Sequence, residues 1–587
     1  MITCAKKSLA LMAGFIFCLS GYAVPAKPGL LCASQPDGTT VNIYLEGDET
    51  GRMAFSPDGY LLTNDENGFY VIADIDSKGF PVSTGIRQIN PENRTLTENE
   101  KISKLNKTEI INSFKAKMSE EGKMMLKPGP GRMTSTFPAE GEQRALVILV
   151  AYQNRDFKIE DPKDYYTRML NEEGFSDNGA TGSAKDYFVS SSSGLFQPQF
   201  DVYGPVKLEQ KGQYYGANNE WGRDSRPQQL VIDACTALDD EIDFTLYDRD
   251  GDGIIDNVYI FYCGYGEADG GGANTIWPHS SNVSSYGLNL YFDGVKLEHY
   301  ACSNEIQAYY DTPDGIGTFC HEFSHVMGLP DLYATSYNNS FTPGSWDLLD
   351  RGSYNNRSRT PPAYSSFERY ALGWIEPIEL EEGEVELPNL FESNKAYLVP
   401  TRRKAEYFLF ENRQKIGFDT TVPGHGMLIW HIDYNSYIWN SNNVNNNEEH
   451  QYVDIIEADD IQSSGTIEGD PFPGTSNITE FSFLTSPSFV SWTKQAGPFR
   501  IYDISETEEG MIHFKVEEFS MADVEKVGVG DAGFQINGKT VSASENSVRI
   551  YDFRGALITI LENSSIVLPS GGYIAVSGKK AEKFIIP

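Results

Sequence analysis

One eleven-residue stretch carries the residue types and spacing of a metal-dependent hydrolase. Residues 321–331 read His-Glu-Phe-Ser-His-Val-Met-Gly-Leu-Pro-Asp. Because an α-helix repeats every 3.6 residues, His321 and His325 lie one above the other on a helix face and can share one metal ion. Zinc accepts imidazole nitrogens, and Glu322 can face the metal-bound water and take its proton. The spacing therefore predicts peptide hydrolysis by a zinc-activated water, with Glu322 as the general base.

The residues after the second histidine predict a third ligand. Gly328 ends the helix or allows a turn that a residue with a Cβ makes less easily, and the turn brings Asp331 back towards the metal. A carboxylate oxygen is a ligand that zinc accepts, and metzincins usually place a histidine at this offset. Two plainer interpretations stay open: a chance HExxH on a surface helix, and Asp331 as an Asx-turn or helix cap. The apolar segment 315–320 favours a buried helix.

An acidic loop upstream has the pattern of a calcium site. The predicted ligands alternate along residues 248–256 and are Asp248, Asp250, Asp252, Asp256 and the backbone oxygen of Ile254. These are ligand places among the first nine positions of an EF-hand-type loop, and Gly253 permits its tight turn. The twelfth position is Tyr259 rather than Glu, so the bidentate ligand is missing or comes from elsewhere. The alternative is an acidic loop without metal, whose carboxylates would repel one another.

Charge and the N-terminus predict an exported protein. The 587 residues carry a formal net charge of −36, so no basic face could dominate the surface and nucleic acid is excluded as a partner. Lys6 and Lys7 precede an apolar run over 8–19, which predicts a signal peptide cleaved after Ala23. We expect no transmembrane segment. The predicted location is extracellular or attached to the outer cell surface, and the predicted partners are protein or peptide substrates.

The chain is too long for one core and is predicted to be an α+β multidomain protein. The predicted boundaries are 1–23 for the signal peptide, 24–135 for a propeptide-like unit, 140–376 for the catalytic domain, 377–520 for a β-rich domain and 521–587 for a small β-sandwich.

The elements expected within these units follow from periodicity and turn residues. In the propeptide-like unit, short strands precede a helix over 98–123 and an exposed Pro-Gly linker over 127–132. A continuous apolar run over 144–152 is typical of a central strand in a mixed sheet beside the active-site helix. Short strands after residue 377 favour a β-sandwich-like domain, and 435–447 reads as an Asn-rich polar loop.

Five cysteines remain once the signal peptide is removed, and their odd number leaves at least one thiol without a partner in the chain. Cys302 and Cys320 could form a disulfide; equally, Cys320 could be a small buried thiol. Cys32 could bind the zinc as a thiolate and block the site, although an unpaired thiol without this role is the favoured interpretation.

Three longer segments resemble a known family. They are HEFSHVMGLPDLY over 321–333, GSWDLLDRGSYNN over 344–356 and DRDGDGIIDNVYIFYCGYGEADGG over 248–271. Together they resemble the immune inhibitor A family of secreted metallopeptidases, peptidase family M6, and the similarity extends over roughly 24–520. The resemblance implies a metzincin-like zincin catalytic domain with zinc ligands His321, His325 and Asp331. It also implies a zymogen.

The sequence departs from the family pattern beneath the metal. Relatives commonly read Trp-Asp-Leu-Met there, whereas this chain has Leu349 at the Met-turn position. Leu is apolar and of similar volume, so it can cushion the site. Arg351 stands where some metzincins place a transition-state tyrosine; Arg351 could polarise a carbonyl oxygen, or Tyr354 could swing in.

The last unit resembles the C-terminal sorting domain of the type IX secretion system. Strongly alternating runs at 548–555 and 568–576 and a short basic-apolar end carry this resemblance. It implies passage across an outer membrane with that machinery as a partner, followed by release or surface attachment. The alternative is an ordinary accessory β-domain.

These observations predict a secreted zinc endopeptidase that acts on extracellular proteins. The rival is a catalytically degenerate surface protein that binds host protein or glycan through its β-domains. Leu349 and Arg351 favour the rival slightly, whereas Glu322 argues against it, because a binding protein has no need of that carboxylate. A zinc amidase is a weaker third alternative.

Overall fold

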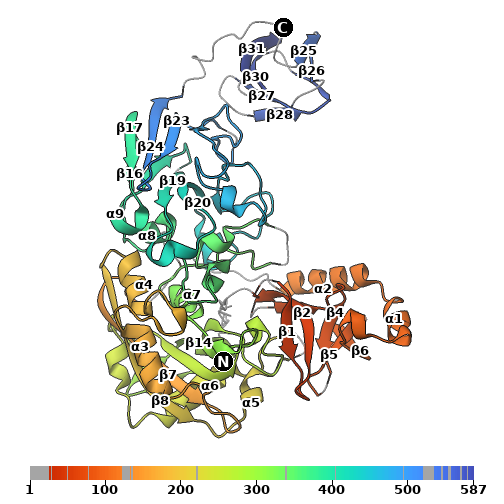
Figure 1. Cartoon of the computed structure of the whole chain (residues 1–587), viewed down its shortest axis with the longest axis vertical. Coiled ribbons are helices and arrows are strands. Elements are labelled where there is room, and N and C mark those ends of the chain that lie inside the picture. Colours follow the sequence, from red (N-terminus) through yellow and green to blue (C-terminus); the bar gives the residue numbers. More distant parts are fainter. Residues whose placement is uncertain are drawn as a thin grey trace, which may run out of the picture.

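The structure is a computed structural model, shown in Figure 1, in which a central body carries an N-terminal unit at its side. It describes residues 26–586 except 28, 49–50, 66, 77–78, 122–132, 134–136, 220–221, 337–339, 404, 494, 520–533, 538, 544–546, 553–556, 569–570 and 578–579. The predicted signal peptide and the linker at 127–132 lie outside the described residues. Among the described helices, none has the length and apolarity needed to cross a membrane.

The N-terminal unit is a six-stranded antiparallel meander followed by two helices. The strands, each paired with the next, are β1 (Leu31–Ser34), β2 (Thr40–Asp48), β3 (Gly51–Phe55), β4 (Leu61–Asn64), β5 (Tyr70–Ile75) and β6 (Pro81–Arg87). The helical stretch expected over about 98–123 is divided into two helices, α1 (Leu96–Ile102) and α2 (Lys107–Glu121). Ser103 Oγ donates to the Glu100 carbonyl, and Asn106 Oδ1 accepts from Glu109 N–H. Such local side-chain bonds compete with a continuous helix.

A mixed sheet forms the centre of the molecule, in the order β11-β14-β10-β7-β8. Its strands are β7 (Gly141–Ala151), β8 (Phe196–Lys207), β10 (Val258–Tyr265), β11 (His279–Asn282) and β14 (His299–Gln307). Strands β8, β7, β10 and β14 are parallel and β11 is antiparallel. The predicted central strand at 144–152 is confirmed as β7. Val147 and Leu149 point into one apolar cluster and Ile148 into another, so both faces are covered.

Helices cover both faces of this sheet. The cluster on one face contains residues of α3 (Pro162–Asn171), α4 (Ala184–Ser191) and α7 (Ile316–Val326). The cluster on the other face contains residues of α5 (Gly212–Gly216) and α6 (Pro227–Ala237). A small sheet of β12 (Leu290–Phe292), β13 (Val295–Leu297) and β9 (Ile254–Ile255) adjoins the second cluster, and β15 (Thr312–Pro313) pairs with β14.

Two sheets after residue 377 enclose a further apolar cluster. One sheet contains β16 (Ile378–Glu379), β18 (Tyr397–Pro400), β19 (Glu406–Arg413), β20 (Gly426–Asp433) and β21 (Val453–Ile455). The other contains β17 (Gly383–Leu387), β22 (Glu480–Phe481), β23 (Phe499–Glu506) and β24 (Ile512–Glu518). Three short helices accompany them: α8 (Ser366–Ala371), α9 (Leu390–Ser393) and α10 (Ser436–Asn440). Phe410 and Met427 from the first sheet pack with Phe514 from the second.

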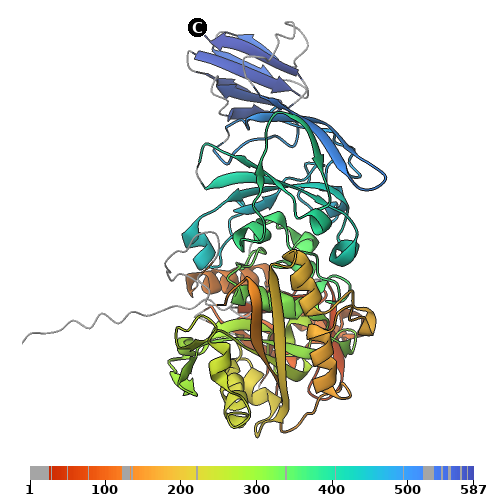
Figure 2. The ribbon, with the colours of Figure 1, turned by 90° about the vertical axis from the view of Figure 1, so that its left-hand side faces the viewer.

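The apolar core continues across the predicted boundary at residue 377. The opposite face of the first of these sheets carries Leu409, Trp430 and Ile432, which belong to the same cluster as Phe323 of α7. In the views of Figures 1 and 2 this β-rich unit lies directly against the central body. We infer that the two units stabilise each other.

The C-terminal unit caps the far end of the molecule (Figure 2). It has two sheets, one of β25 (Phe534–Asn537), β26 (Thr540–Ala543) and β29 (Ser565–Val567), the other of β27 (Val548–Asp552), β28 (Leu557–Leu561), β30 (Gly571–Ser577) and β31 (Lys580–Ile586). Val541 and Ile550 contribute to its own small core, and Arg549 Nη1 donates to the Thr485 carbonyl of the β-rich unit at 3.1 Å. With its mixed central sheet and added β-units, the chain has the predicted α+β class.

Buried carboxyl groups in the β-rich unit make stability depend on pH. Burial, and then the charge of Glu457, raise the pKa of Asp470 to about 8, although Asp470 Oδ2 accepts a hydrogen bond from Trp346 Nε1 at 3.0 Å. A carboxyl pKa raised in the fold means that the stabilisation by the neutral form is complete below about pH 4. That stabilisation is lost as the pH rises towards about 8.

The variant Asp470→Asn keeps an acceptor for Trp346 but has no carboxyl group to ionise. We therefore expect the melting temperature of Asp470→Asn minus that of wild type to increase as the pH rises from 4.5 to 8. The gain corresponds to at most about 1.4 kcal/mol per pH unit. Calorimetry at several pH values measures it, with the exposed Asp240→Asn as the control. Parallel pH profiles for Asp470→Asn and wild type would contradict the raised pKa.

Candidate metal centre

The helix α7 is fixed closely against a neighbouring segment at its start and is followed by a glycine turn. At its start, Gly317 N–H donates to the Ser358 carbonyl at 2.6 Å, and a Cβ on Gly317 would lie 2.0 Å from the Ser353 carbonyl oxygen. Only glycine allows the helix to approach that segment so closely. At its end, Gly328 has a φ of +91°, so the prediction that the chain turns there is confirmed.

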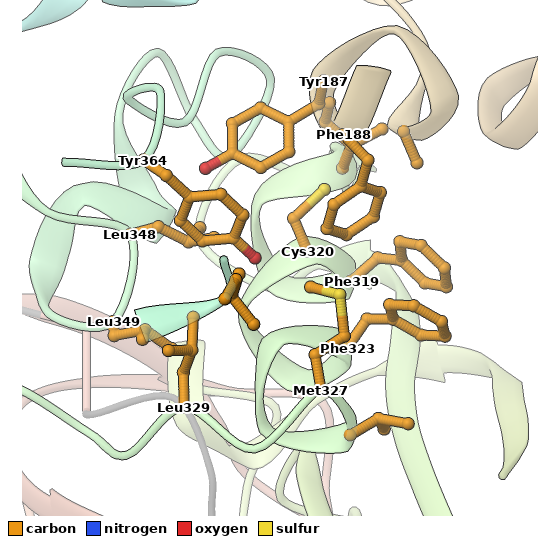
Figure 3. Close-up of a cluster of buried hydrophobic side chains, with 14 of the residues drawn as sticks. Tyr187, Phe188, Phe319, Cys320, Phe323, Met327, Leu329, Leu348, Leu349 and Tyr364 are labelled. Carbon is orange, nitrogen blue, oxygen red and sulfur yellow. The ribbon is translucent and has the colours of Figure 1, made fainter. Parts of the chain in front are cut away.

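The interior face of α7 is apolar and tightly packed, as Figure 3 shows. Phe319 and Phe323 pack edge-on against Phe200, with ring centroids 5.0 and 5.4 Å apart. Every residue of α7 is buried, which removes the interpretation of HExxH as part of a surface helix. The packing fixes the rotation of the helix and therefore the direction of its two histidines.

Three side chains converge at the other face of α7. His321 Nε2 and His325 Nε2 are 3.1 Å apart, and each lies 3.2 Å from Asp331 Oδ1. All three residues are buried. Ligands at zinc distances with tetrahedral angles would be about 3.3 Å apart, so the triangle has the size of three corners of a zinc site.

Hydrogen bonds to the backbone set the orientation of both imidazoles. His321 Nδ1 lies 2.8 Å from the Leu348 carbonyl, and His325 Nδ1 lies 2.8 Å from the Leu329 carbonyl. A carbonyl only accepts, so each Nδ1 carries a proton, and the neutral form of each imidazole then presents its Nε2 lone pair to the centre of the triangle. Two lone pairs and a carboxylate oxygen aimed at one point suit a cation, and this is the orienting arrangement that metal-binding histidines use.

The ionisation of Asp331 agrees with a ligand role. Burial opposes ionisation, but when His321 and His325 carry a proton on Nε2 as well, the charge of His325 and the hydrogen bonds that both imidazoles donate lower the pKa of Asp331 to about 2. A cation bound between the three side chains would take the place of those protons. Its backbone N–H and its Oδ2 bond to Asn442, which explains why the residue does not form a simple Asx turn.

Glu322 is buried beside the strands of the mixed sheet. Burial raises the pKa of Tyr259, Cys302 and Tyr354, and the charge of Glu322 adds to each shift. For Tyr354, the charges of Asp269 and Asp314 contribute more than that of Glu322. Arg351 is instead exposed, on the short helix η7 (Arg351–Tyr354). Of the two candidates for a transition-state contact, Tyr354 is the less exposed one.

Leu349 lies beneath the metal-binding segment. It is buried in the cluster shown in Figure 3, and its carbonyl accepts from Leu332 N–H at 2.9 Å. The neighbouring Leu348 carbonyl is the one that orients His321. The segment at the Met-turn position thus supports the site through its backbone, with an apolar side chain below.

The N-terminal unit packs against one edge of the site region. Leu31 of β1 belongs to the same cluster as Ala268 and Trp277, and Tyr354 packs against that cluster. Lys27 N–H also donates to the Ala268 carbonyl at 3.1 Å. The Gly-rich loop around residue 268 therefore serves as a docking surface for the N-terminal unit.

Among the described residues Cys302 and Cys320 are both free, so the disulfide alternative is wrong and the buried-thiol alternative describes them. Burial raises the pKa of both thiols. Cys32 is also free and is not among the residues grouped with the histidines. Two further buried histidines have other partners: His279 Nε2 lies 2.9 Å from Tyr300 OH, and His431 Nε2 lies 2.9 Å from Glu406 Oε1.

The acidic loop brings three of its predicted ligands together. Asp248, Asp250 and Asp252 have carboxylate oxygens within 4.8 Å of one another. Burial, an opposing hydrogen bond from Arg249 N–H and then the charges of the other loop aspartates leave the pKa of Asp256 raised to about 7. Ile254 N–H donates to Asp252 Oδ1 at 2.8 Å. Tyr259, the twelfth residue, is buried in the main core, so it contributes no ligand.

Sequence reasoning missed the groups that orient the ligands. The role of the Leu348 and Leu329 carbonyls could not be predicted from residue type, because every residue has a backbone carbonyl. Asn442 lies 111 residues after Asp331, in the stretch that was expected to be only a polar loop. Only the tertiary fold brings Asn442 next to the candidate ligand Asp331, so the sequence alone could not predict this contact.

Comparison with known proteins agrees with the metal-binding geometry of this site. Residues 149–375 match the family described as Immune inhibitor A peptidase M6, catalytic domain. The pre-pro-metalloprotease PrtV of Vibrio cholerae serotype O1 (strain M66-2) is 29% identical over 252 residues, 36% of this chain and 27% of that protein. Immune inhibitor A of Bacillus thuringiensis subsp. alesti is 27% identical over 288 residues, 41% of this chain and 42% of that protein.

The chain therefore spans less than half the length of these relatives. The family match is also shorter than the resemblance over 24–520 suggested by sequence. It contains His321, Glu322, His325 and Asp331, and it ends before Asn442.

Proposed function

We propose that this protein is a secreted zinc endopeptidase that hydrolyses peptide bonds of extracellular proteins. The observation that carries the proposal is the buried triangle of His321 Nε2, His325 Nε2 and Asp331 Oδ1, with edges of 3.1–3.2 Å. It lies in a stretch that matches the peptidase M6 catalytic domain, and a relative that is 29% identical over 252 residues is named a metalloprotease.

The roles of the side chains follow from their positions in this reaction. His321, His325 and Asp331 hold the zinc ion. Bound zinc would supply a Lewis acid, which lowers the pKa of a coordinated water and polarises the peptide carbonyl. Glu322 accepts the proton of the attacking water on a carboxylate oxygen and then donates it to the nitrogen of the leaving amine.

Tyr354 is the better candidate for a hydrogen bond to the oxyanion. Tyr354 is only partly exposed, whereas the exposure of Arg351 favours a surface role for that residue. Leu349 fills the Met-turn position as an apolar support. In this proposal the substitution of Met by Leu leaves the reaction intact, because the position contributes packing and ligates nothing.

The other units serve export and latency in this proposal. Residues 1–23 direct export, and the N-terminal unit acts as a propeptide that covers the edge of the site near Tyr354. The C-terminal unit acts as a sorting domain for type IX-like secretion. The metzincin-like fold of the catalytic domain and the sandwich form of the β-rich domain belong to the same proposal.

Calcium at the 248–256 loop would stabilise the fold. The carboxylates of Asp248, Asp250 and Asp252 repel one another unless a cation neutralises them. For the zinc-loaded protein, we expect saturating calcium to raise the melting temperature by about 5 °C, the size expected for a ligand at about 100 times its Kd. Asp250→Ala should abolish the shift, and the exposed Asp240→Ala should keep it. A calcium shift that survives Asp250→Ala would place the ion elsewhere.

Chelation tests the peptidase activity directly. Purified protein, before and after trimming between 127 and 132, is incubated with casein with and without 1,10-phenanthroline. We expect cleavage that the chelator abolishes and added zinc restores. Absence of cleavage in every form of a zinc-containing protein would favour the rival, a surface protein that binds host protein or glycan through its β-rich units.

A further inference from the structure

The β-rich unit reaches the metal centre through the Asn-rich segment 442–446, which follows α10. This segment runs alongside residues 331–336. Asn445 Nδ2 donates to the Leu332 carbonyl at 2.8 Å, and Asn446 Oδ1 accepts from Ser336 N–H at 2.9 Å. Two segments more than one hundred residues apart are therefore joined along their length.

Asn442 is the member of this segment that touches a candidate ligand. Its Nδ2 donates to Asp331 Oδ2 at 2.5 Å, and its Oδ1 accepts from Asp331 N–H at 2.8 Å. One side-chain amide thus holds both the backbone and the carboxylate of the same residue. Because Oδ2 is engaged, Oδ1 is the oxygen turned towards both imidazoles, 3.2 Å from each.

Asn442 is itself held rigidly. It has a φ of +50°, a left-handed conformation that asparagine tolerates better than most residues. Its carbonyl accepts from Thr335 Oγ1 at 2.7 Å, its N–H donates to the Trp439 carbonyl at 3.0 Å, and only 6% of the residue is exposed. The amide is therefore pre-oriented towards Asp331.

We propose that Asn442 is a positioning residue of the zinc site, supplied by the β-rich unit to the catalytic unit. It keeps Asp331 Oδ1 aimed at the point that His321 and His325 also face, and it prevents the carboxylate from rotating away. The inference rests on the proposed zinc site and adds that residues 149–375 alone do not complete it. Mutation of a group that orients a metal ligand typically weakens metal binding 10- to 100-fold.

The test measures zinc affinity of the full chain at pH 7.5 by competition with a chromogenic chelator. Asn442→Gly removes the amide without straining the left-handed backbone. Asn445→Ala is the matched control, since it removes a bond to Leu332 that joins the same two segments, along with a bond to Val453, and none to Asp331. We expect Asn442→Gly to raise the zinc Kd about 10- to 100-fold and Asn445→Ala to raise it less than about 3-fold, within ordinary context effects.

A double-mutant cycle separates positioning from general loss of packing. In an Asp331→Ala background, Asn442→Gly should change the zinc Kd less than about 2-fold, because the residue acts through Asp331. An unchanged Kd in Asn442→Gly, or an effect of the same size with and without Asp331, would overturn the inference. Wild-type protein that binds no zinc would overturn the proposed function as well, whereas tight zinc unaffected by Asn442→Gly would overturn this inference alone.

Discussion

Glu322→Gln is expected to lower the rate of casein cleavage about 100- to 10,000-fold, the usual contribution of a general base. Glutamine has the size of glutamate and keeps an oxygen for hydrogen bonding, but its amide cannot take a proton from water. The side chain is buried and does not belong to the ligand triangle. One zinc per chain should therefore remain in the variant.

Initial rates on casein and metal analysis of the same sample measure the two quantities together. Glu376→Gln provides the control, because Glu376 is an exposed carboxylate of the same type. A variant at position 322 that retains more than about a tenth of the wild-type rate would assign the base to another residue. Loss of zinc together with activity would instead indicate that Glu322 supports the metal.

His325→Ala is expected to weaken zinc binding about a thousandfold or more, because it removes one of the three ligands and one of the two imidazoles. The remaining His321 Nε2 and Asp331 Oδ1 are 3.2 Å apart and present only two donors. Casein cleavage should disappear at the zinc concentrations that saturate the wild type.

Competition with a chelator measures this change in affinity. His425→Ala is the matched control, because His425 is half-exposed and bonded to Glu506 in the β-rich unit. Equal zinc affinity in wild type and His325→Ala would remove His325 from the site. A similar loss in His425→Ala would point to a general effect of removing histidine.

The features that sequence predicted well are local ones. His321 and His325 share a face because of helix geometry alone, and Gly328 turns the chain because few residues other than glycine adopt its φ of +91°. The central strand could be predicted because a sheet covered on both faces leaves a continuous apolar run.

Features that depend on distant contacts could not be predicted. The break between α1 and α2 comes from Ser103 and Asn106, whose bonds to the neighbouring backbone outweigh the helical pattern. Trp430 and Ile432 alternate along their strand with residues that face the core between the two sheets of the β-rich unit. No sequence pattern indicates that the face carrying Trp430 and Ile432 packs against the catalytic unit. Asn442 is an asparagine in an asparagine-rich segment, so its residue type carried no distinguishing signal.

X-ray absorption at the zinc edge of the purified full chain tests the central claim most directly. The account predicts one zinc per chain with a nitrogen and oxygen shell at about 2.0–2.1 Å, and outer scattering from two imidazoles. A zinc–sulfur shell at about 2.3 Å would contradict it, because a cysteine would then occupy a place assigned here to His321, His325 or Asp331.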